Sequence, residues 1–137
     1  MLAQVLIVFG AALWGFLGII HIIYTFFTDK LEPCDPTTIA AMKATSPVLT
    51  RQTNLWKGWI GFNAGFGLGL LLFGTTYLLL AAGHMAVLHD SPALAWLPVA
   101  GGTAQLAIAR RYFFRRPIIG VGIATACFLA AAFALSF

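Results

Sequence analysis

The lysines and arginines of this chain lie in only two short stretches, each bounded on both sides by long apolar runs. All 8 basic residues belong to these stretches, and the polar segment around 83–91 contains none. They are Lys30, Lys43, Arg51 and Lys57 in the first stretch and Arg110, Arg111, Arg115 and Arg116 in the second. Basic residues confined to alternate connections between apolar runs are typical of a membrane protein whose basic loops stay in the cytoplasm. The pattern therefore predicts a chain that folds in a lipid bilayer.

The composition also favours a bilayer over water as the surrounding solvent. Hydrophobic residues make up 61% of the 137 residues and charged residues 9%, against roughly 25% charged in an ordinary soluble domain. The net charge of +4 needs no nucleic acid to explain it, because a nucleic-acid binder collects its basic residues on one polar face. We expect a single transmembrane domain over residues 1–137.

Four apolar runs are long enough to cross a bilayer, whose hydrocarbon core of ~30 Å needs ~20 helical residues. They cover about 2–27, 58–82, 92–110 and 118–137. Backbone groups in lipid must be hydrogen-bonded internally, and runs of this length favour helices over the shorter strands of a barrel. The predicted fold is an all-α, antiparallel bundle of four transmembrane helices. Both termini are expected on the non-cytoplasmic side, and the first span is expected to be retained because Met1–Gln4 carries no basic residue.

Local start signals place two helices around the first basic stretch. Asp35-Pro36 is typical of an N-cap residue followed by proline at the first helical position. It predicts a short helix near 37–44 within the cytoplasmic loop 28–57. Ser46-Pro47 repeats this signal. It predicts one long second helix over about 47–82, with a polar extension into the cytoplasm.

The third and fourth spans are expected to meet at the second basic stretch. Ser91-Pro92 starts the third helix, which is expected to reach about Phe114. Arg115-Arg116-Pro117 is expected to form a tight turn into the fourth span. Inside the third helix, Pro98 leaves the carbonyl of Leu94 without its usual backbone donor. The sequence therefore predicts a bend or a hinge at this proline.

Three polar side chains from three different spans are predicted at one depth. Counted at ~1.5 Å per residue from the cytoplasmic ends of their spans, His21, Asn63 and Gln105 all lie roughly 8–9 Å inside the boundary. Polar groups within a membrane usually face the protein interior or a water-filled cavity. We expect these three side chains to point at one another. They form either an interhelical hydrogen-bond clamp or a small polar pocket open to the cytoplasmic leaflet.

A stripe on the first helix passes through the same region. Trp14, Gly18, His21 and either Tyr24 or Thr25 follow three- and four-residue steps and therefore share a face. Such a stripe either lines a groove or is the inward face of a bundle, and packing is the interpretation we favour.

The second span contains a ridge of small residues. Gly61, Gly65 and Gly69 are spaced by four, and small residues at this spacing permit close approach of a second helix. The partner is either another helix of the same chain or a helix of another subunit. The sequence favours internal packing, with the small residues of the fourth span as one candidate partner.

The arginines at 110–116 also allow two interpretations. They set the topology, or they form a dedicated site for a lipid headgroup or a phosphate, because basic residues near a membrane surface attract anionic lipids.

Enzyme and cofactor chemistry is not indicated. All four acids lie in predicted connections, so no carboxylate within a span is available for a proton relay. Cys34 and Cys127 are expected at different depths and cannot form a redox pair. His84 and His89 lie at the opposite turn from His21, which does not suit a bis-histidine haem. We predict no catalytic residue, no metal and no cofactor.

Several of these motifs resemble an uncharacterised family of small four-span bacterial membrane proteins. The similarity rests on the run 46–51, on Trp56 and the run 59–63, on His21 and on Arg110-Arg111-Tyr112, and it covers most of the chain. The resemblance implies the four-span fold and a bacterial inner membrane, and no activity comes with it.

These features together favour a non-enzymatic integral membrane protein. We expect an accessory or structural subunit, or a bundle that associates with itself. The alternative is a small lipid or solute carrier with a polar pocket near the cytoplasmic side. The expected partners are the lipid bilayer with its anionic headgroups and either a second copy or a larger membrane complex, with no nucleic acid.

Overall fold

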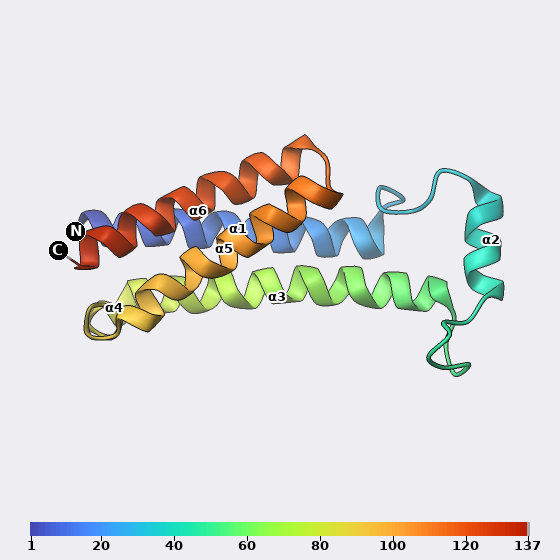
Figure 1. Ribbon diagram of the computed structural model, residues 1–137, viewed down its shortest axis with the longest axis horizontal. Helices are drawn as coiled ribbons and strands as arrows, with labels where there is room; N and C mark the ends of the chain where they lie inside the picture. Colours follow the sequence, from blue (N-terminus) through green and yellow to red (C-terminus); the bar gives the residue numbers. More distant parts are fainter. Residues whose placement is uncertain (137) are drawn as a thin grey trace. The chain divides into compact units, whose positions relative to one another are not determined.

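The computed structural model describes residues 1–136 and is all-helical over that range (Figure 1). Helices make up 83% of it, and residues 1–136 contain no strand. Its elements are α1 (Leu2–Phe27), α2 (Pro36–Ala44), α3 (Leu55–Gly83), α4 (Met85–Asp90), α5 (Pro92–Tyr112) and α6 (Arg115–Ser136). Among the described helices, α1, α3, α5 and α6 are long and apolar enough to cross a membrane. The predicted fold class, all-helical with four candidate spans, is confirmed to that extent.

The chain divides into two compact units. The first, here called the terminal unit, comprises residues 1–17 and 70–136 and contains α4, α5 and α6. The second, here called the loop unit, is Gly18–Gly69 and contains α2. Helices α1 and α3 each contribute residues to both units.

The predicted cytoplasmic extension of the second span is wrong, because α3 begins at Leu55. The side-chain oxygen of Asn54 accepts from the backbone N–H of Lys57 at 2.9 Å, which is the bond of an N-cap. The segment before it is rich in β-branched and hydroxyl residues with weak helix propensity. It forms turns instead, with the Thr50 N–H donating to the Pro47 carbonyl. The cap at Asn54 therefore overrides the start signal at Ser46.

The basic stretch between α5 and α6 also differs from the prediction. Helix α5 ends at Tyr112, and Arg115-Arg116-Pro117 forms the first turn of α6 rather than a loop. Proline is tolerated there because the N–H groups of a first helical turn have no intrahelical acceptor. The connection is therefore only Phe113-Phe114. Helix α4 lies in the segment that was expected to be a simple turn.

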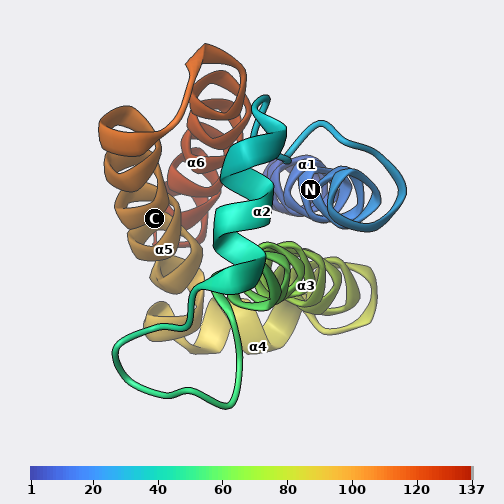
Figure 2. The same cartoon turned by 90° about the vertical axis from the view of Figure 1, so that its right-hand side faces the viewer.

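Aromatic side chains form the centre of the terminal unit. Trp14 of α1 lies 4.8 Å from Phe73 of α3 and 5.9 Å from Phe128 of α6, measured between ring centroids. Tyr77 stacks on Phe73 at 4.9 Å. Helices α5 and α6 run side by side in both views (Figures 1 and 2). This core brings together α1, α3 and α6 of the terminal unit.

Hydrogen bonds between side chains and the backbone stabilise the loop unit. Asp35 caps α2 by accepting from the Thr37 N–H at 2.9 Å, as predicted. The Thr37 hydroxyl also donates to this carboxylate, and the hydroxyl bond followed by the N–H bond lowers the pKa of the Asp35 carboxyl. The indole N–H of Trp59 donates to the carbonyl of Leu31 at 2.9 Å. The segment 45–54 forms a wide loop between α2 and α3 (Figure 2).

Candidate functional site

A hydrogen-bonded pair of polar side chains joins α1 and α3 inside the loop unit. The Nε2 atom of His21 lies 3.0 Å from the Oδ1 atom of Asn63. The Asn63 amide nitrogen donates to the carbonyl of Trp59 at 2.8 Å, so its oxygen is the atom that accepts from histidine. With the amide in this orientation, a neutral His21 donates from Nε2, and its Nδ1 is an acceptor.

The surroundings of the pair fix the histidine further. The hydroxyl of Thr25 donates to the backbone carbonyl of His21 at 2.7 Å. The Phe66 ring contacts the imidazole edge-on, with centroids 4.9 Å apart. His21 is half-buried, and its hydrogen bond is made to the neighbouring helix. The geometry is that of an interhelical clamp.

The other residues predicted around this pair are distributed over both units. Gln105 is half-buried on α5 in the terminal unit, and its contact with the pair stays a prediction. Trp14 belongs to the aromatic core, and its indole nitrogen is buried without a hydrogen-bond partner among residues 1–136. Tyr24 lies under Lys30, whose Nζ is 4.6 Å from the ring centroid. Of the two residues proposed for the end of the stripe, Thr25 is the buried one, at 8% exposure.

The predicted glycine ridge has no packing partner within the loop unit, to which Gly61, Gly65 and Gly69 belong, and its packing against the fourth span stays a prediction. A Cβ atom added to Gly61, Gly65 or Gly69 would meet no atom within 4 Å outside its own helical surroundings. All three glycines lie on exposed positions of α3. The physical reason is the rotation of α3 about its own axis. Asn63 bonds to α1 and Tyr77 bonds to α5, and both side chains project from a different face of α3 than the three glycines do. The alternative, a contact with another subunit, stays a prediction.

Two other glycines of α3, which the sequence reasoning missed, make close contacts with α1. A Cβ on Gly74 would lie 2.6 Å from both the carbonyl oxygen of Ala11 and the nitrogen of Gly15, in the terminal unit. A Cβ on Gly67 would lie 3.1 Å from the carbonyl oxygen of Gly18, in the loop unit. Both glycines let the backbones of α1 and α3 approach directly. Their spacing of seven residues is the signal that could have identified them.

Tyr77 supplies the donor that Pro98 removes. Its hydroxyl donates to the carbonyl of Leu94 at 2.7 Å, and that carbonyl is the group that a residue with an N–H at 98 would normally bind. Tyr77 is 3% exposed and Leu94 is half-buried, so this bond is partly buried within the terminal unit. The predicted orphan carbonyl therefore receives a hydrogen bond from a neighbouring helix, and the bend or hinge at Pro98 stays a prediction. Gln4 acts in a similar way on α3, donating to the carbonyl of Ala81 at 2.8 Å.

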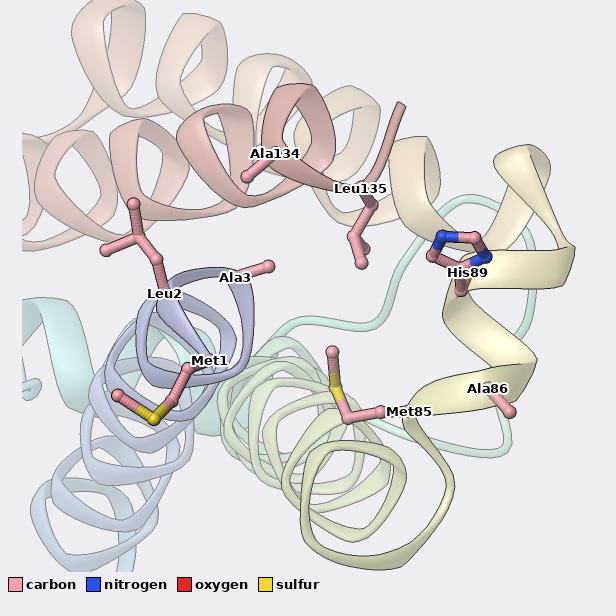
Figure 3. Close-up of a pocket in the computed structure, with 8 residues that line it drawn as sticks. All are labelled: Met1, Leu2, Ala3, Met85, Ala86, His89, Ala134 and Leu135. Atoms are coloured by element: carbon pink, nitrogen blue, oxygen red, sulfur yellow. The ribbon is translucent and has the colours of Figure 1, made fainter. Parts of the chain in front are cut away.

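A cavity of about 450 Å³ lies at one end of the terminal unit (Figure 3). The start of α1, helix α4 and the end of α6 surround it. Its lining is Met1, Leu2, Ala3, Met85, Ala86, His89, Ala134 and Leu135. His89 is the one ionisable side chain of this lining, and its Nδ1 is 3.7 Å from the neighbouring Asp90. The cavity lacks the converging polar groups that orient a small molecule in most ligand sites.

The arginines predicted to meet lipid headgroups are all exposed. Arg110 and Arg111 lie in the last turn of α5, and Arg115 and Arg116 in the first turn of α6. The guanidinium of Arg111 lies 5.6 Å from the centroid of the Tyr112 ring.

Residues 1–136 contain no group of three histidine, cysteine, aspartate or glutamate side chains placed to hold a metal ion. Comparison of the chain with protein-family models, with curated proteins and with solved structures finds no match. The function therefore has to be argued from the chain's own geometry.

Proposed function

We propose that the protein is a non-enzymatic integral membrane protein that assembles through its transmembrane helices. It acts as a self-associating bundle or as an accessory subunit of a larger membrane complex. The observation that carries this proposal is the open glycine ridge of α3, formed by Gly61, Gly65 and Gly69. In lipid, small residues along one helix face permit the backbone contact that drives helix association. The ridge offers such a face, with no neighbour within 4 Å in its own unit.

The proposed arrangement is an antiparallel bundle with both termini on the non-cytoplasmic side. Contacts between α1 and α3 support it, because Gln4 bonds near the end of α3 at Ala81 while His21 bonds near its start at Asn63. The cavity lining supports it too, since the first and last helical turns of the chain meet α4 there. Both basic stretches are then cytoplasmic. The resemblance to small bacterial membrane proteins favours a bacterial inner membrane.

The assembly is tested by filling the ridge. Replacing both Gly61 and Gly65 by leucine is expected to remove the partner, because the two side chains would block close approach of a second helix. The measurement is native mass spectrometry of the protein extracted gently from its own membrane with lipids retained. Ala126→Leu on an exposed position of α6 is the matched control and should leave the assembly intact. An unchanged assembly mass in the folded double variant would rule out the ridge as the interface.

The second candidate function is a small lipid or solute carrier that binds beside His21. One observation favours it, namely the free acceptor at Nδ1 of a histidine inside a candidate span. A clamp and a binding site make different demands on the same side chain. The clamp needs only the bond to Asn63, whereas a carrier needs a ligand in contact with the imidazole.

Removing the histidine distinguishes the two functions. In a double-mutant cycle of His21→Leu and Asn63→Leu, the clamp predicts a coupling of about 1 kcal/mol in the free energy of unfolding. The measurement is equilibrium unfolding of the four proteins in mixed micelles. The clamp also predicts that small molecules retained by the purified protein are the same in His21→Leu as in the unaltered chain. Loss of one defined small molecule from His21→Leu would instead favour the carrier.

A further inference from the structure

Four arginines gather where α5 passes into α6, around a connection of only two residues. One pair, Arg110 and Arg111, ends α5, and the other pair, Arg115 and Arg116, begins α6. All four are exposed. Because Phe113-Phe114 is the whole connection, the two pairs are held close to each other at one end of the α5–α6 hairpin (Figure 1).

No carboxylate of the same unit lies near these arginines to compensate their charge. The only acidic residue in the described part of the terminal unit is Asp90, which lies beside His89 at the other end of α5. Helix α5 has 21 residues, which at the α-helical rise separates Asp90 from Arg111 by roughly 30 Å. That distance is nearly four times the Debye length of about 8 Å at physiological salt. Within its unit, the arginine cluster is therefore an uncompensated positive charge.

The second pair is also placed against the dipole of its own helix. Cations are favourable at a helix C-terminus, where Arg110 and Arg111 lie, and unfavourable at an N-terminus, where Arg115 and Arg116 lie. The fold of the chain gives no reason for two cations in the first turn of α6. An anion bound at this turn would compensate both the guanidinium charges and the positive end of the helix.

The aromatic residues between the pairs indicate that this anion belongs to a lipid. Tyr112 is 74% exposed and Phe114 is 66% exposed, directly between the two arginine pairs. Exposed aromatic rings at the end of a membrane helix settle at the level of the headgroups. They would place the guanidinium groups beside lipid phosphates rather than in open water.

We propose that the turn formed by residues 110–116 is a specific site for an anionic phospholipid that carries two phosphates. One phosphate is bound by the arginine pair that ends α5 and the other by the pair that begins α6. Arginine suits this role because its planar guanidinium binds phosphate oxygens in a bidentate manner, which lysine cannot do. A role in topology alone requires positive charge but no preference among anionic lipids. The site requires one chain only and is independent of the proposed assembly.

The test is the retention of lipids by the purified protein after mixing with defined vesicles, measured by native mass spectrometry. One set of vesicles contains a two-phosphate phospholipid, and the other contains a single-phosphate anionic phospholipid at equal total charge. The unaltered chain is expected to retain one two-phosphate lipid in preference. Replacing either arginine pair by glutamine is expected to weaken that binding about thirtyfold. Replacing Arg51 and Lys57 by glutamine removes equal charge from the other basic stretch and should leave the preference unchanged.

Lysine variants keep the test valid if loss of charge disturbs insertion. One double variant replaces Arg110 and Arg111 by lysine, and the other replaces Arg115 and Arg116 by lysine. Both variants retain the charge that sets topology. They are expected to insert normally and to lose the preference for the two-phosphate lipid. Equal retention of both lipids by the unaltered chain, or a preference that survives in both lysine variants, would overturn the site. Displacement of the lipid by millimolar pyrophosphate would assign the cluster to a soluble phosphate compound instead, and would overturn the lipid assignment.

Discussion

Gly74→Ala is expected to lower the free energy of unfolding by about 1–3 kcal/mol, the usual cost of overpacking a close contact. The added Cβ would lie 2.6 Å from two backbone atoms of α1, the carbonyl oxygen of Ala11 and the nitrogen of Gly15. Backbone atoms cannot turn aside as a side chain can, so α1 and α3 would have to separate along this contact. Larger residues at position 74 should prevent the terminal unit from packing at all.

The control for this prediction lies on the same helix. A Cβ on Gly58 would meet no atom within 4 Å. Gly58→Ala should therefore be neutral, or stabilising by up to ~1 kcal/mol through its better helix propensity. Unfolding in mixed micelles with increasing detergent strength, followed by circular dichroism, measures both variants. If Gly74→Ala were as stable as Gly58→Ala, the direct backbone contact between α1 and α3 would be wrong.

The sequence predicts helix starts well where one capping signal acts alone. Asp35 and Ser91 both cap the helices assigned to them, because an N-cap depends on the few residues that follow it. The start of α3 was predicted eight residues early because two caps compete there. Ser46 precedes a segment of weak helix formers, whereas Asn54 directly precedes the apolar helix and makes the capping bond to Lys57. Which of the two caps starts the helix depends on the summed helix propensity of the residues that follow it rather than on the capping residue itself.

The sequence can predict which polar groups lie at the same level of two helices. It cannot predict from glycine spacing alone which side of a helix meets its neighbour, because that side depends on where the neighbouring helix lies. His21 and Asn63 could be matched because each was counted from the end of its own span, and the two side chains are hydrogen-bonded. A repeat of four selected the glycines at 61, 65 and 69, but spacing alone does not say which side of α3 meets α1. That side is given by Asn63, and Gly67 and Gly74 follow it at four and eleven residues. Using the polar residue to set the helix phase would have identified the buried glycines.

Tyr77→Phe is expected to lower the free energy of unfolding by about 1–3 kcal/mol, although it removes a single oxygen atom. The reason is the carbonyl of Leu94, which receives its hydrogen bond from the Tyr77 hydroxyl because Pro98 has no N–H to offer. Without that hydroxyl, a half-buried carbonyl inside a candidate span loses its donor, and an acceptor left without a partner in lipid carries a desolvation penalty. The effect should be measured by the same unfolding titration.

A second substitution tests this explanation directly. Pro98→Ala restores a backbone N–H at the position that normally donates to Leu94, four residues earlier in α5. In that background, Tyr77→Phe should cost much less, so the two substitutions should couple by most of the single-variant effect. Strictly additive effects would mean that the hydroxyl stabilises the protein in some other way. Strong coupling would show that Tyr77 of α3 supplies the hydrogen bond that Pro98 removes from α5.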